Sequence, residues 1–195
     1  MSSAVEVLTP IAETTWAVIP PDARIGHVHL RVADLERASK FYREVLGFRI
    51  VLDGQSMGLP VVFLAAGNYH HHIALNTFPS AAATPPPSKH TGLHHFAILY
   101  PDEVSLARAV ARLLKFQHRL DDTRDHGCTL SAYLRDPDGN GIELYYDRPR
   151  SEWFGADGRP VIKSEPFDVK EWLDSVWRGN ARMGAGSDIR RRMRK

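Results

Sequence analysis

The chain has 195 residues, of which 43% are hydrophobic and 25% are charged, so it is long enough to bury one substantial core. Its formal net charge of +2 is too small to indicate nucleic-acid binding, and its single cysteine, Cys128, excludes an internal disulfide and a cysteine-rich zinc site. No apolar segment approaches the roughly 20 residues that a membrane helix needs. We therefore expect a cytoplasmic protein with neither a nucleic-acid nor a membrane partner.

Two segments of the chain resemble each other. One begins at Gly26 ("GHVHLRVADLERASKFYREVLGF") and the other at Leu93 ("LHHFAILYPDEVSLARAVARLLKF"). Placing His27 over His95 also places Phe48 over Phe116, with no gap between these anchors. Each copy opens with alternating apolar residues, which predict a strand with one buried face. An aspartate turn and apolar residues at three-to-four spacing follow, which predict a helix.

The segments after each predicted helix read as strands: 48–52, 61–65 and 71–78 in the first copy, and 129–134 and 141–147 in the second. The chain is therefore predicted to have an α+β fold, with two tandem βαβββ modules around one cavity. The first module is predicted at residues 24–79, a Pro-, Ser- and Ala-rich linker at 80–92, and the second module at 93–150. We expect an N-terminal extension at 1–23 and a C-terminal tail at 151–195 with a short helix near Glu171 and a basic end.

Three side chains of metal-binding type are predicted to face the cavity. Strand residues alternate between faces, so the apolar residues mark the helix-packed face and the remainder mark the cavity face. His27, His95 and Glu143 fall on the cavity side, near related ends of corresponding strands. Two imidazoles and one carboxylate can hold iron(II) and leave positions open for substrate and dioxygen. The alternative is that they are unrelated polar residues on a solvated sheet face.

The consecutive histidines His70, His71 and His72 precede one of the predicted strands. Ile73 and Leu75 belong to its packed face, so alternation predicts that His72 faces the cavity and that His71 points to the opposite side. His70 is then expected at the rim of the pocket. The same alternation turns Tyr133 toward the cavity from a later strand.

The chain resembles the vicinal oxygen chelate superfamily of glyoxalase, bleomycin resistance and dioxygenase proteins. The similarity covers roughly residues 24–150, and "DPDGNGIEL" is its most specific part. The resemblance implies one open-barrel domain with metal ligands at His27, His95 and Glu143. Within the superfamily, "HHIAL" and "DHGCTLSAY" look most like the catechol 2,3-dioxygenase-like (type I extradiol) proteins. That likeness implies a catalytic role for His72, and substrate contacts from His126 and Tyr133.

The resemblance implies an iron(II)-dependent extradiol dioxygenase that acts on a small aromatic diol and dioxygen, with manganese(II) as a possible substitute for iron. His72 would then act as the acid and base that carries protons. Asp125 is a candidate to fix the tautomer of its neighbour His126. Many extradiol enzymes carry four modules, so the two modules of this chain favour a homo-oligomer.

Two other functions compete with this interpretation. A glyoxalase-like or other non-oxidative metal-dependent enzyme would use the same scaffold with a different metal. A non-enzymatic member would only bind a small molecule, and such a protein has no need of the three predicted metal ligands.

Overall fold

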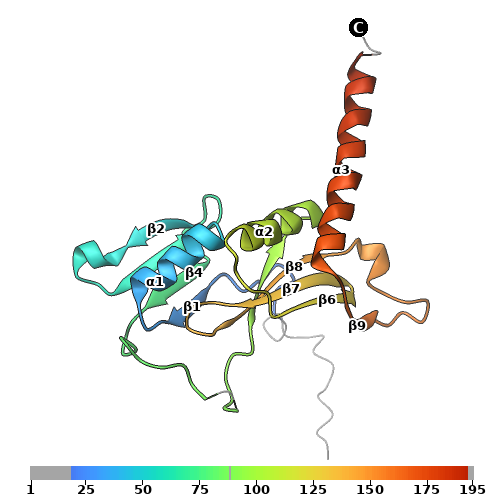
Figure 1. The fold of residues 1–195 in the computed structure, drawn as a ribbon. Helices are drawn as coiled ribbons and strands as arrows, with labels where there is room; N and C mark the ends of the chain where they lie inside the picture. The colour runs from blue at the N-terminus through green and yellow to red at the C-terminus, as the bar shows by residue number, and fades with distance from the viewer. Residues whose placement is uncertain (1–18, 88, 193–195) are drawn as a thin grey trace, which may run out of the picture.

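In the computed structural model, which describes residues 19–87 and 89–192, the chain forms two sheets, each with one face packed against helices (Figure 1). The first sheet runs in the order β1 (Val28–Arg31), β4 (Ile73–Asn76), β3 (Val61–Ala65) and β2 (Arg49–Asp53). The second runs in the order β5 (Phe96–Tyr100), β8 (Gly141–Asp147), β7 (Thr129–Arg135), β6 (Asp122–Gly127) and β9 (Ile162–Pro166).

The two sheets repeat the same topology. The first strand of each module pairs in parallel with the last, β1 with β4 and β5 with β8, and the other neighbours are antiparallel. The predicted α+β fold of two βαβββ modules is thus confirmed. Across the described part of the chain, no strand pairing joins the two sheets into a closed barrel.

Each module places a helix after its first strand, and an aspartate begins both helices. Asp34 precedes α1 (Leu35–Lys40), where its carboxylate accepts a hydrogen bond from the Arg37 amide at 3.0 Å. Asp102 precedes α2 (Glu103–Lys115) and accepts from the Ser105 amide at 2.7 Å. Such caps satisfy amide groups that have no partner inside the helix. A π-helical turn, Phe41–Val45, continues α1.

The structure adds elements that the sequence pattern does not reveal. Strand β6 has the sequence "DTRDHG", which contains no apolar alternation, so only two strands are recognisable after α2. The C-terminal tail supplies β9 and a long helix, α3 (Val169–Arg192), where a short helix was expected. Leu173 and Val176 of α3 are buried in the common core. Short 3-10 turns lie at Gly54–Met57 and Arg150–Glu152.

Most of the predicted N-terminal extension, residues 1–18, lies outside the described residues, as do the last three residues of the basic end. Within residues 19–87 and 89–192, no helix combines the length and apolar composition that a membrane crossing requires.

A buried carboxylate, Asp136, links the two modules. It lies in the turn between β7 and β8 and is only 5% exposed. The hydroxyl of Tyr42, from module one, donates to its Oδ2 at 2.9 Å. The amides of Asp138 and Asn140 donate to Oδ1 at 2.9 and 2.8 Å. Burial raises the pKa of Tyr42 well above its ordinary value, and the charge of Asp136 adds to the effect, so this hydroxyl stays a donor.

Tyr42→Phe should lower the free energy of unfolding by about 1–2 kcal/mol, because it removes one donor from a buried carboxylate that keeps its others. Urea denaturation of the purified chain measures this change. Tyr100→Phe is the matched control, since it removes a hydroxyl from β5, away from Asp136, and should change stability much less. Equal losses in the two variants would contradict the linking role of Tyr42.

Candidate active site

The open face of the second sheet carries a row of polar side chains. The opposite face buries Ile142, Leu144 and Leu134 against α2 and the core, so the residues between them point away from the core. Tyr133 pairs across the strands with Glu143, which places both side chains on the open face. The prediction that Tyr133 and Glu143 share one face is confirmed.

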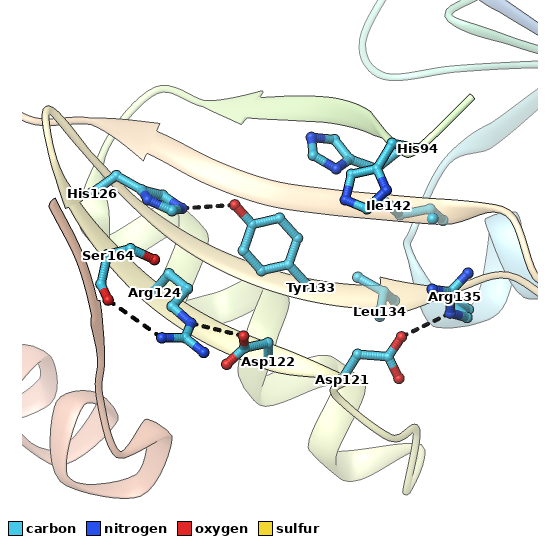
Figure 2. A pocket seen from close by; sticks show the side chains of 12 residues that line it. His94, Asp121, Asp122, Arg124, His126, Tyr133, Leu134, Arg135, Ile142 and Ser164 are labelled. Atoms are coloured by element: carbon cyan, nitrogen blue, oxygen red, sulfur yellow. Dashed lines mark hydrogen bonds and ion pairs between the residues drawn. The ribbon is translucent and has the colours of Figure 1, made fainter. Parts of the chain in front are cut away.

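Four of the six predicted site residues form a continuous chain of contacts. His95 Nε2 lies 3.1 Å from Glu143 Oε2. The hydroxyl of Tyr133 donates to Glu143 Oε1 at 2.8 Å, and His126 Nε2 lies 2.8 Å from the same hydroxyl. Figure 2 shows the contact between His126 and Tyr133, with the two side chains arising from adjacent strands.

Three of these four side chains border a pocket of about 450 Å³. His95, His126 and Tyr133 line it, together with Asp122, Arg124 and Ser164. Arg124 is not free within it, because its guanidinium donates to Asp122 at 2.7 Å and to the carbonyl of Ser164 at 3.3 Å (Figure 2). The hydrogen bonds of Arg124 therefore fix the orientation of polar groups in the pocket. The volume of the pocket falls in the range of about 300–1,000 Å³ typical of small-molecule sites.

The hydroxyl of Tyr133 is held in its protonated form. Burial, the hydrogen bond to Glu143 and the charge of that carboxylate raise the pKa of Tyr133 to about 12. A hydroxyl carries a single hydrogen, so Tyr133 can donate to either Glu143 or His126, but not to both at once. Tyr133 thus couples the histidine of the pocket to the carboxylate beside His95.

In module one, the structure differs from the prediction for the consecutive histidines. The ring of His71 stacks on Phe63 with ring centres 4.6 Å apart, and lies 4.5 Å from the ring of His27. Phe63 pairs with Ala74, as does His29, so these residues lie on the open face of the first sheet. The prediction that His71 points to the opposite side is therefore wrong.

His72 lies at a bend just before β4, which begins only at Ile73. The backbone pairing of the sheet nevertheless continues through His72, whose amide donates to the Leu64 carbonyl at 2.8 Å and whose carbonyl accepts from the Val28 amide at 3.0 Å. His71 precedes these contacts, and alternation does not hold there. The amide of Ala66 donates to His72 Nδ1 at 3.2 Å, and the ring of Tyr69 packs against His72 at 4.6 Å. Burial is the largest cause that lowers the pKa of His72, and the nearby His70 adds to it. Burial likewise lowers the pKa of His71, with smaller contributions from the neighbouring histidines.

His95 and Glu143 fit one part of a metal site. Two ligand atoms at about 2.1 Å from a metal ion and at right angles to each other lie about 3 Å apart, as the two contacting atoms do here. Imidazole nitrogen and carboxylate oxygen also suit iron(II) and manganese(II). Among the described residues, however, no three His, Cys, Asp or Glu side chains are grouped closely enough to hold an ion. His27 lies beside His71 rather than in such a group, because alternation predicts the face of a residue but not the spacing of two sheets.

Asp125 does not orient His126, contrary to expectation. Its carboxylate pairs with Arg148 at 2.8 Å and with Lys163 at 3.1 Å, and accepts from the Gly127 amide at 2.8 Å. The partner of His126 Nδ1 is the backbone carbonyl of Lys163, at 3.1 Å. A backbone contact from the tail leaves no signal in the sequence, so the sequence does not predict that Lys163 is the partner of His126.

The sequence model of the Glyoxalase/Bleomycin resistance protein/Dioxygenase superfamily matches residues 24–144. The chain belongs to this superfamily. It is 38% identical to a catechol-2,3-dioxygenase of Bacillus subtilis (strain 168) over 161 residues, which cover 81% of this chain and 54% of that protein. It is 31% identical to biphenyl-2,3-diol 1,2-dioxygenase 3 of Rhodococcus globerulus, covering 64% of this chain and 63% of that one.

The chain therefore spans little more than half the length of the first of these relatives. Among solved structures, a glyoxalase/dioxygenase from Nostoc punctiforme superposes with a TM-score of 0.55 at 20% identity, covering 70% of this chain and all of that one. This likeness concerns the fold alone, and it agrees with the fold described above.

The Asp125→Asn variant tests the ion pairs of the Asp125 carboxylate through the pH dependence of stability. Burial opposes ionisation of Asp125, but the Gly127 amide, Lys163 and Arg148 together lower its pKa. Its ionisation thus adds stability that is present above the unfolded pKa of about 3.9 and is lost as pH falls through the lower folded pKa. The variant should be less stable than the wild type by about 1–3 kcal/mol at pH 7. Urea titrations should show this difference shrinking in acid, and a difference that stays constant would contradict the assignment.

Proposed function

We propose that the chain is an iron(II)-dependent extradiol dioxygenase that cleaves the ring of a catecholic substrate. The main support is the contact chain from His95 and Glu143 through Tyr133 to His126 at the edge of a small-molecule pocket. The 38% identity to a protein named catechol-2,3-dioxygenase favours this chemistry over the other reactions of the superfamily. We propose His27, His95 and Glu143 as the residues that would hold the metal.

Iron(II), or manganese(II) in its place, would supply open positions that hold the two oxygens of a catechol and dioxygen next to each other. The protein's own groups orient the reactants. Tyr133 keeps the Glu143 carboxylate in a fixed orientation through its hydrogen bond, as the outer partners of metal ligands do. His126 and Tyr133 present one nitrogen and one hydroxyl to the pocket, where substrate oxygens can exchange hydrogen bonds with them.

A catechol that binds as an anion must give up a proton, and the product must regain one. We propose that His72 carries this proton. Its pKa is lowered, so the imidazole is neutral near pH 7. Its Nδ1 accepts from the Ala66 amide, so the neutral ring carries its hydrogen on Nε2 and can donate it there. To take the catechol proton, Nδ1 must first give up its contact with Ala66, because it holds the only free nitrogen lone pair of the ring.

Glu143→Gln should weaken metal binding at least about tenfold, because it removes the anionic ligand. Anaerobic reconstitution with iron(II), followed by metal analysis and by oxygen uptake with catechol, measures both consequences. His90→Ala is the control for adventitious binding by histidine, since His90 lies on the exposed linker, and it should leave both properties unchanged. Iron retention by Glu143→Gln at the wild-type level would contradict the ligand assignment.

The same assay separates the competing functions. Oxygen uptake and a yellow ring-opened product support the dioxygenase. Wild-type chain that holds iron but consumes no oxygen with any catechol would instead favour a non-oxidative enzyme of the superfamily. Chain that takes up no metal at all would favour a small-molecule binder.

His72→Ala should keep its iron while turnover falls about 10²–10⁴-fold, the usual contribution of a positioned acid or base. His71→Ala is the informative comparison, because His71 rather than His72 packs against the proposed ligand His27. We expect His71→Ala to reduce metal affinity more than His72→Ala does. Loss of iron in His72→Ala would show that His72 is a ligand and would contradict its role as proton carrier.

A further inference from the structure

Strand β9 lies outside residues 24–144, the part of the chain that the superfamily model matches. It adds to the edge of the second sheet beside β6, with Asp125 opposite Glu165 and Gly127 opposite Ile162. The register shifts between Asp125 and Gly127, so His126 sits at an irregularity next to Lys163. Ser164 of β9 lines the pocket, and Figure 2 shows it facing Arg124.

The geometry points to a role for β9 in positioning His126. We propose that the backbone carbonyl of Lys163 holds His126 in the tautomer that carries its hydrogen on Nδ1, and so directs an unprotonated Nε2 toward Tyr133 and the pocket. The catalytic consequence of this arrangement rests on the proposed dioxygenase function, whereas the tautomer does not.

The hydrogen-bonding chemistry leaves one neutral arrangement for His126. A carbonyl oxygen can only accept, so the 3.1 Å contact with Lys163 requires a hydrogen on Nδ1. In a neutral imidazole the other nitrogen, Nε2, is then an acceptor, 2.8 Å from the Tyr133 hydroxyl. The neutral ring therefore takes the single hydrogen of Tyr133, which otherwise goes to Glu143. Without the Lys163 carbonyl, the contact between Nε2 and the Tyr133 hydroxyl would allow either tautomer, because a hydroxyl can both donate and accept.

Two features hold that carbonyl in place. The ammonium group of Lys163 lies between Asp125 at 3.1 Å and Glu165 at 3.0 Å, and Asp125 is itself held by Arg148. Gly127 has a positive φ of 85°, and a Cβ added there would lie 2.6 Å from Val161 Cγ1. Glycine at this position therefore permits the close approach of the chain that leads into β9.

Gly127→Ala is the first test, with Gly158→Ala as its matched control. Both glycines have positive φ, but a Cβ at Gly158 meets nothing within 4 Å, so the control carries the backbone strain without displacing β9. The ¹⁵N NMR signals of the His126 ring in metal-free protein at alkaline pH report the tautomer, and His126→Gln assigns them. The wild type and Gly158→Ala should show the hydrogen on Nδ1, and Gly127→Ala should show a mixture or the Nε2–H form.

A second pair of variants covers the case in which Gly127→Ala fails to fold. Lys163→Met removes the ammonium group from Asp125, and Lys163→Arg restores a cation at the same position. Lys163→Met should shift the tautomer toward Nε2–H, and Lys163→Arg should shift it back. Glu165→Gln breaks only the more exposed ion pair and should leave the wild-type tautomer unchanged.

In iron-loaded enzyme, the variants that change the tautomer should lose about 10–100-fold in kcat, the range seen when an outer partner of an active-site group is removed, with a much smaller change in KM. An Nε2–H tautomer in the wild type would overturn the proposal. So would a wild-type tautomer in both Gly127→Ala and Lys163→Met. A correct tautomer in a protein without dioxygenase activity would overturn the proposed function alone.

Discussion

The buried carboxylate of Asp136 is the interaction on which the arrangement of this molecule depends. An ionised side chain with so little solvent contact is tolerable only when donors surround it. Here the donors come from its own turn and from Tyr42 of the other module. The same group thus closes the β7–β8 hairpin and ties it to module one. Because the hairpin register places Tyr133 opposite Glu143, this turn helps to fix that pair within the site.

The second constraint is the sharing of one hydrogen at Tyr133. Glu143 is a carboxylate that only accepts, and His126 is turned by Lys163 so that Nε2 also accepts in its neutral form. The hydroxyl therefore has two acceptors and one hydrogen. A cation bound to Glu143 would replace the Tyr133 hydrogen as the partner of that carboxylate. The hydroxyl could then donate to His126 or to a bound substrate. The residues proposed to hold the metal in the second sheet and those proposed to contact the substrate are in this way parts of a single hydrogen-bonded system.

The sequence predicts the parts of this site that depend on local periodicity. Strand alternation is physically strict inside a regular strand, so the placement of Tyr133 and Glu143 on one face is correct. It fails at His71, which lies before β4 begins. It is silent about β6, whose polar residues carry no apolar pattern, and about β9, which reaches the site through a backbone carbonyl. The contact between β9 and His126 is long-range and uses a main-chain carbonyl of β9, so no residue type in the sequence indicates it.

The position of His27 illustrates a different kind of limit. Its face follows from Leu30 and Val32, which are buried on the other side of β1. Its distance from His95 depends instead on how two separate sheets are held, through contacts such as Tyr42 with Asp136 that lie on the helix side of the molecule. A change in those contacts would shift one sheet relative to the other but would leave the His95 and Glu143 pair intact, since β5 and β8 are hydrogen-bonded neighbours. The pair within one sheet is therefore the rigid part of the candidate metal site, and the ligand from the other sheet is the part that the packing between modules can adjust.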